Sequence, residues 1–66
     1  MVKSFKSKYT VVFHWPHGIV EVVGKFAYFS DAEAFAQYAA QAYHMTSVNI
    51  LNKQADCISL FHGLAT

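Results

Sequence analysis

The sequence predicts an α+β domain with the element order β-β-α-β-β, in which one helix packs on one face of a four-stranded antiparallel sheet. Runs rich in β-branched and aromatic residues lie on both sides of a single alanine-rich segment with helical periodicity. Residues that favour turns separate these runs. The 66 residues are the length of one domain, 1–66, and residues 1–8 form a polar lead-in.

The first two strands are predicted at residues 9–15 and 19–28, because YTVVFHW and the apolar alternation that follows have strand composition. The segment WPHG lies between them. Pro16 suits the second position of a type I turn, and Gly18 suits the left-handed position that follows, which is typical of a short hairpin with a glycine bulge. Gly24 indicates a bulge or a bend inside the second strand.

The helix is predicted from residue 30, where Ser30 and Glu33 have the spacing of a capping box. Its apolar stripe contains Ala32, Phe35, Ala36, Ala39, Ala42 and Tyr43. The opposite polar stripe contains Glu33, Gln37, Gln41 and His44. The last two strands are expected at residues 45–51 and 57–62, with a turn at 52–56 between them.

Strict alternation along the strands divides the side chains between two faces of the sheet. The face beneath the helix is expected to hold Val11, Phe13, Val20, Val22, Phe26, Val48, Ile50, Ile58 and Leu60. The other face is expected to hold Val12, His14, Ile19, Glu21, Val23, Leu51 and Phe61. A slip of one residue would exchange the faces of a strand.

The second of these faces is more apolar than the water-facing side of an antiparallel sheet normally is. The whole chain is 55% hydrophobic and only 14% charged, against typical values of about 45–50% and 25%. A domain of this size has little interior, so part of this surplus is expected at an exposed patch that binds a partner. We therefore expect a protein interface on the second face, and a secondary interface on the helix at Glu33, Gln37 and Gln41.

No motif predicts catalysis, a metal or a cofactor. His14, His17, His62 and Cys57 could supply four zinc ligands, but no recognised ligand spacing joins them. Cys57 and His62 are five residues apart in a strand, so regular alternation would point them to opposite faces and prevent a nucleophile–base pair. The glycines are scattered, which excludes a phosphate-binding loop.

The composition favours a protein partner over a nucleic acid or a membrane. The formal net charge is +1, and all five basic residues are lysine, whereas arginine is the usual reader of bases and phosphates. No stretch approaches the ~20 apolar residues of a membrane span. Cys57 is the only cysteine, so no disulfide within one chain can form, and a reducing, cytoplasmic location is expected.

The sequence is thus interpreted as a small, non-enzymatic protein-binding module. One alternative is a nucleic-acid-binding protein that uses Lys3, Lys6 and Lys8 with the aromatic residues Tyr9, Phe13 and Trp15. Another is a homodimeric structural subunit. In size and layout the chain resembles the small accessory proteins of bacteriophages and mobile elements, anti-CRISPR proteins among them. This resemblance implies an inhibitor that covers a functional surface of a larger host complex.

Overall fold

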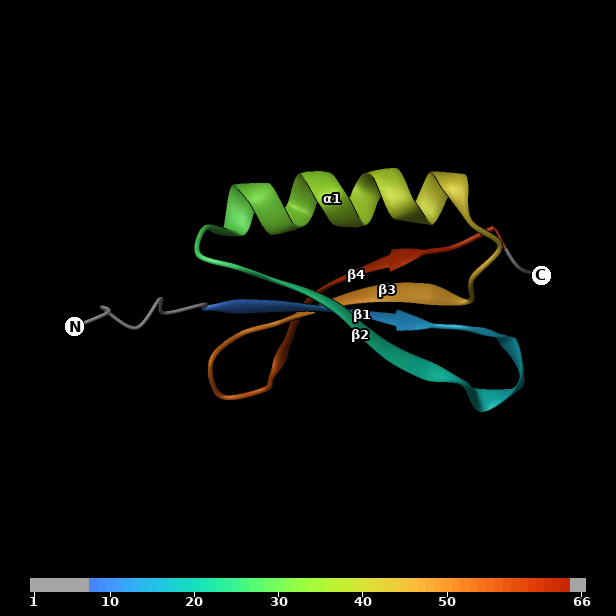
Figure 1. Ribbon diagram of the computed structural model, residues 1–66, viewed down its shortest axis with the longest axis horizontal. Helices are drawn as coiled ribbons and strands as arrows, with labels where there is room; N and C mark the ends of the chain where they lie inside the picture. The colour runs from blue at the N-terminus through green and yellow to red at the C-terminus, as the bar shows by residue number, and fades with distance from the viewer. Residues whose placement is uncertain (1–7, 65–66) are drawn as a thin grey trace.

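The computed structural model, which describes residues 8–64, has the α+β fold that the sequence predicts (Figure 1). Its elements in chain order are β1 (Tyr9–His14), the short 3₁₀ turn η1 (Pro16–Gly18), β2 (Val20–Phe26), α1 (Phe29–Ala42), β3 (Ser47–Leu51) and β4 (Cys57–His62). The strands form one antiparallel sheet in the order β2-β1-β3-β4. The helix lies along one face of this sheet, and the other face has no helix on it (Figure 1).

The N-cap of the helix lies two residues earlier than the capping box predicts. The Ala32 amide donates to the Tyr28 carbonyl at 3.2 Å, so Tyr28 is the N-cap and no side chain caps this end. The Ser30 cap is therefore wrong: Ser30 lies inside the first turn. The reason is a packing contact, because Phe29 lies edge-on to Tyr9 with ring centroids 5.6 Å apart and packs against the core.

The core lies between the small side chains of α1 and the two central strands. Ala32, Ala36, Ala39 and Ala40 are buried, and they allow the helix to approach the sheet closely. Phe35 stacks on Phe13 with ring centroids 6.0 Å apart. The predicted apolar stripe is thus confirmed for Ala32, Phe35, Ala36 and Ala39, whereas Ala42 and Tyr43 are exposed and Ala40 is buried. From the sheet the core contains Val11, Phe13, Val48 and Ile50.

The WPHG segment connects the first two strands, as expected, but not through a type I turn, which would give His17 a negative φ. His17 and Gly18 both have positive φ, 71° and 80°. The Trp15 amide donates to the Ile19 carbonyl at 2.7 Å and closes the loop. Strand β1 ends at His14, so Trp15 belongs to this connection rather than to the strand.

Two register shifts decide which side chains face the helix. In β2, Val11 pairs with Gly24 but Val12 pairs with Val22, so Val23 is an extra residue at a bulge, where Gly24 indicated one. In β4, Ile50 pairs with Ser59 but Leu51 pairs with Cys57, so Ile58 is the extra residue. Beyond each bulge the alternation of side chains is reversed relative to a regular strand.

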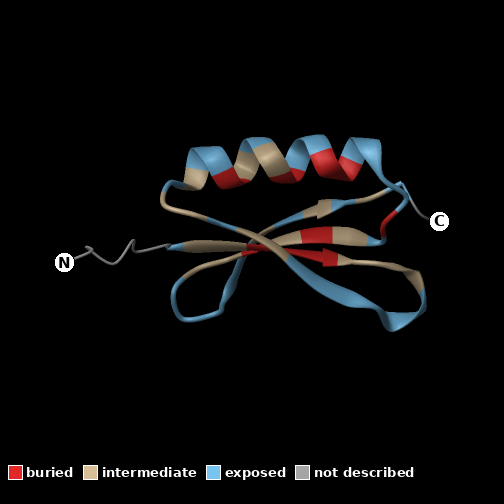
Figure 2. Ribbon diagram, viewed as in Figure 1, coloured by how far each residue is buried: buried red, intermediate tan, exposed pale blue. Residues whose placement is uncertain are grey.

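The expected division of β2 and β4 between the two faces is therefore wrong. Val23 and Phe61 pack against the core beneath the helix, and Glu21 shares their face as the register partner of Phe13. Val20, Val22, Ile58 and Leu60, which were expected beneath the helix, are exposed instead. Figure 2 shows the first half of β2 exposed, in contrast to the buried segments of β1, β3 and α1.

Met45, in the connection between α1 and β3, is fully buried. It was expected at the start of a strand, but β3 begins only at Ser47. Gly63 lies against it: a Cβ at this position would collide with the Met45 carbonyl. The Gly63 amide donates to the Thr46 carbonyl at 3.0 Å, which fastens the end of β4 to this connection.

Candidate interaction face

The sheet face that points away from α1, which we call the open face, is built from three rows of side chains across all four strands. Because register partners lie on the same side of a sheet, the rows follow from the pairing. They are Lys25–Thr10–Leu51–Cys57, Val22–Val12–Asn49–Leu60 and Val20–His14–Ser47–His62. Ile58 adds a further apolar side chain at the bulge beside Cys57.

Apolar side chains lie along the two edges of the open face. Val20 and Val22 on β2 are 59% and 60% exposed, and Ile58 and Leu60 on β4 are 45% and 46% exposed. An antiparallel sheet that faces water normally places polar residues at such positions. Val12, in the middle row, is buried and yet does not belong to the core beneath the helix. In their exposed apolar side chains, the edges of the open face are thus the part that most resembles a protein–protein interface.

The centre of the open face is polar and carries a short chain of hydrogen bonds. The Ser47 hydroxyl donates to Asn49 Oδ1 at 3.3 Å, and Asn49 Nδ2 donates to Cys57 Sγ at 3.3 Å. The Cys57 thiol in turn donates to the Ser59 carbonyl at 3.4 Å. Lys25 is the one charged residue in the three rows, and none of their residues is acidic. The face therefore suits a partner surface that is largely apolar with a polar centre.

The residues expected to form the interface are divided by the structure. Val12, His14 and Leu51 lie on the open face. Glu21, Val23 and Phe61 lie on the helix side, because of the two bulges. Ile19, 58% exposed, lies in the connection between η1 and β2. Of the secondary set, Gln37 and Gln41 are exposed on α1 and Glu33 is half-buried. That these residues bind a partner stays a prediction.

Alternation along the sequence did not predict the four exposed residues at the edges of the open face, which are Val20, Val22, Ile58 and Leu60. A signal for β2 was available, because Gly24 indicated a bulge, and a bulge there reverses the alternation of everything before it. Strict alternation applied across Gly24 without a bulge placed Val20 and Val22 on the same side of the sheet as Phe26. In β4 no glycine or proline marks the bulge, and apolar residues occur on both faces.

The candidate ligands and nucleophiles lie apart. Within residues 8–64, no three His, Cys, Asp or Glu side chains come together as a group that could hold a metal ion. Cys57 and His62 share the open face after all, because the bulge adds a residue between them. They stand at opposite ends of β4, however, and five residues of strand span about 16 Å. Cys57 is exposed.

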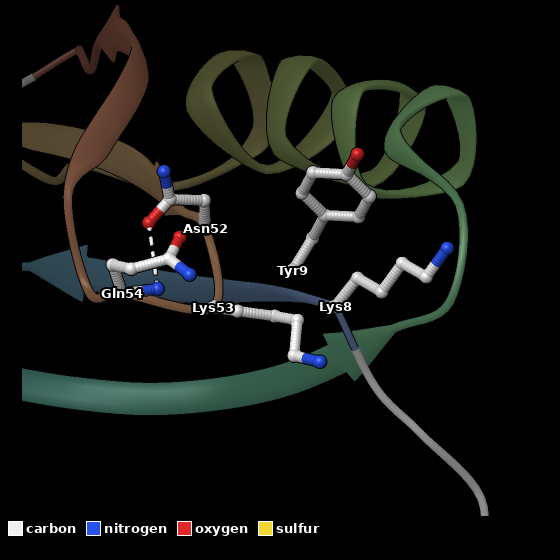
Figure 3. A pocket seen from close by; sticks show the side chains of 5 residues that line it. All are labelled: Lys8, Tyr9, Asn52, Lys53 and Gln54. Atoms are coloured by element: carbon white, nitrogen blue, oxygen red, sulfur yellow. Dashed lines mark hydrogen bonds between the residues drawn. The ribbon is translucent and has the colours of Figure 1, made fainter.

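A shallow hollow of about 190 Å³ opens where β1 begins beside the turn between β3 and β4 (Figure 3). It is lined by Lys8, Tyr9, Asn52, Lys53 and Gln54. The turn is ordered by Asn52 Oδ1, which accepts the amides of Gln54 and Asp56, both at 2.9 Å. Both lysines are exposed, and Lys3 and Lys6 of the expected basic arm lie outside the described residues.

The aromatic residues that a base-stacking sheet would need are turned toward the helix. Phe13 is buried between Phe35 and Trp15, and Tyr9 packs against Phe29. Trp15 packs against the same core. The open face carries no aromatic ring in its three rows, apart from the imidazoles of His14 and His62. The platform on which the nucleic-acid alternative depended is therefore absent from the sheet surface that the structure describes.

Comparison with known proteins adds no assignment: no family model, no curated protein and no solved structure matches this chain. Among the described residues, no helix has the length and apolar character needed to cross a membrane.

Proposed function

We propose that this protein is a non-enzymatic binding module that attaches to another protein through the open face of its sheet. The observation that carries the proposal is the exposure of four large aliphatic side chains along the edges of one sheet face, Val20, Val22, Ile58 and Leu60. Large apolar side chains exposed in this way are typical of protein interaction sites. Among the described residues, the large apolar side chains exposed on and next to α1 are those of the tyrosines Tyr28, Tyr38 and Tyr43.

A protein partner fits the chemistry of this face better than a nucleic acid does. A phosphate backbone needs several cations, and Lys25 is the one lysine in the three rows. Apolar side chains at the edges and neutral polar groups at the centre would instead pair with a protein surface of similar composition. In the format of a small phage-type accessory protein, such binding would inhibit a host complex by covering one of its surfaces. The free thiol of Cys57 is compatible with action in the cytoplasm.

Capture of partners by variant proteins tests the proposal. The bait would be the full chain, its Val22→Lys variant and, as a matched control, Gln37→Lys on the exposed side of α1. Both substitutions place a lysine at an exposed position, so both proteins should fold. A lysine forced into an apolar interface would be desolvated without a counter-charge, which costs several kcal/mol.

We expect nuclease-resistant partners that Gln37→Lys retains and Val22→Lys loses. Partners lost with Gln37→Lys and retained by Val22→Lys would instead assign binding to the helix stripe of Glu33, Gln37 and Gln41. Partners that disappear after nuclease treatment would favour nucleic acid binding through the lysines.

A further inference from the structure

We propose that two copies of this chain pair through their β4 strands, antiparallel and about a two-fold axis at Leu60, so that their sheets join edge to edge. This inference concerns the edge of the sheet rather than its open face, and it stands independently of the proposed function. It rests on three features of β4: its unprotected edge, the direction of its backbone groups, and a register in which every residue meets a compatible neighbour.

The first feature is the lack of protection on β4. It is an edge strand, and no described residue pairs with its outer side. Edge strands are usually guarded by charged residues, proline or a bulge, because their free backbone groups can pair with another strand. The six residues of β4, CISLFH, include no Lys, Arg, Asp, Glu or Pro. Its bulge lies at the first two residues and leaves Ser59 to His62 regular.

The other edge strand, β2, has features that normally prevent an edge strand from pairing with another strand. It carries Glu21 and Lys25, and its bulge at Val23 lies in the middle of the strand, where it interrupts the alternation of the backbone groups. The two edges of the same sheet therefore differ in their readiness to accept a further strand, and β4 is the one that is open.

The second feature is the direction of the backbone groups. The Gly63 amide donates to the Thr46 carbonyl, so Gly63 faces β3. In an antiparallel strand the N–H and C=O groups of successive residues point alternately to the two sides. Phe61 and Ser59 therefore also face β3, while His62 and Leu60 direct their backbone groups to the open side. Leu60 lies at the middle of the free segment.

The third feature is the register. Paired residues lie on the same face of a sheet, and a two-fold axis at Leu60 satisfies this requirement along the strand. Leu60 meets its own copy on the open face. His62 of the second copy, also an open-face residue, comes opposite Ile58, the extra residue of the bulge. On the helix side, Ser59 meets Phe61 of the second copy, so a small side chain is opposite a large one. Because β4 contains no Lys, Arg, Asp or Glu, this pairing places no like charges opposite one another.

A second copy fits this edge better than other strands do. The pairing is self-complementary, which is what a closed two-fold dimer requires. Pairing of β4 with β2 of the next copy would instead be head-to-tail and open-ended, and the charges and bulge of β2 oppose it. Small domains also gain the stability that their own limited core does not supply when they associate.

Disulfide crosslinking reports the register directly. In a Cys57→Ser background, a hydroxyl replaces the thiol that Asn49 contacts, and no native cysteine remains. Leu60→Cys would then place two thiols on residues whose Cα atoms are about 5.5 Å apart, within the range that a disulfide needs. Ile58→Cys is the matched control, since Ile58 and Leu60 are 45% and 46% exposed. In this register the two copies of residue 58 lie about 13 Å apart, too far to bridge.

We expect the chain to sediment as a dimer. With oxidised glutathione, Leu60→Cys should form covalent dimers at least about tenfold faster than Ile58→Cys, because thiols out of reach bridge only after the backbone moves. Val22→Lys, on the opposite edge of the sheet, should dimerise like the original chain, which separates this test from that of the proposed function. A chain that sediments as a monomer at all concentrations, equal crosslinking at both positions, or loss of the dimer with Val22→Lys would each overturn the proposal.

Discussion

Trp15 donates a hydrogen bond from Nε1 to Glu21 Oε1, at 3.0 Å, across the connection between β1 and β2. The same indole packs edge-on against Phe13, with ring centroids 5.8 Å apart, and lies 6.3 Å from the ring of Tyr43 at the end of α1. Glu21 is thus the polar anchor of an aromatic cluster that joins the first hairpin to the helix. This contact is possible because the bulge at Val23 places Glu21 on the helix side of β2, opposite Phe13.

Removal of this anchor should cost a modest amount of stability. We expect Glu21→Val to lower the free energy of unfolding by about 1 kcal/mol, because the bond is charge-assisted but exposed to water. A double-mutant cycle with Trp15→Phe, measured by urea denaturation, isolates the pair. A coupling free energy of about 0.5–1 kcal/mol is expected. Strictly additive effects of the two substitutions would show that the contact contributes nothing to stability.

Ser30→Ala should have little effect on the helix. Its side chain is not the N-cap, so no helix-end amide loses an acceptor, and the change in unfolding free energy should stay within about 0.5 kcal/mol. Asp31→Ala is the comparison, because a carboxylate in the first turn interacts with the helix dipole and its loss should cost about 0.3–1 kcal/mol. Thermal unfolding followed by circular dichroism measures both. A loss of 1 kcal/mol or more from Ser30→Ala would restore the capping box.

Gly63→Ala should destabilise the fold, although Gly63 lies near the end of the described chain. The added Cβ meets the Met45 carbonyl, which is backbone and cannot rotate away. Overpacking of this kind costs about 1–3 kcal/mol. Gly18→Ala is the contrasting change: its Cβ would have open space, so only the strain of a positive φ of 80° remains, about 1 kcal/mol. Equal midpoints of urea unfolding for Gly63→Ala and the original chain would contradict this packing.

The sequence alone was sufficient for the element order and for the central part of the core. Val11, Phe13, Val48 and Ile50 lie on the two central strands, where alternation is regular through their positions, and all four are buried as expected. The helical stripe of Ala32, Ala36 and Ala39 was visible for the same reason, since helical periodicity is unbroken there.

The edge strands could not be assigned by alternation, because each contains a bulge. One extra residue in β2 exchanges Val22 and Val23 between the faces, and one extra residue in β4 does the same for Leu60 and Phe61. The strand order was also beyond the sequence, because β1, whose one side pairs with β2 in the hairpin, pairs on its other side with β3, which is distant in the chain. The candidate face depends on these features, so its central residues were found and its apolar edges were not.

The bulge in β2 places Val22 on the open face and Val23 against the core. Urea unfolding of Val22→Lys and Val23→Lys tests this with the same substitution at neighbouring positions. We expect Val22→Lys to stay within about 0.5 kcal/mol of the original chain, as an exposed position should. Val23→Lys should lose several kcal/mol, because it brings an unpaired charge against the core. A stable Val23→Lys beside an unfolded Val22→Lys would reverse the two faces and remove the candidate interaction face.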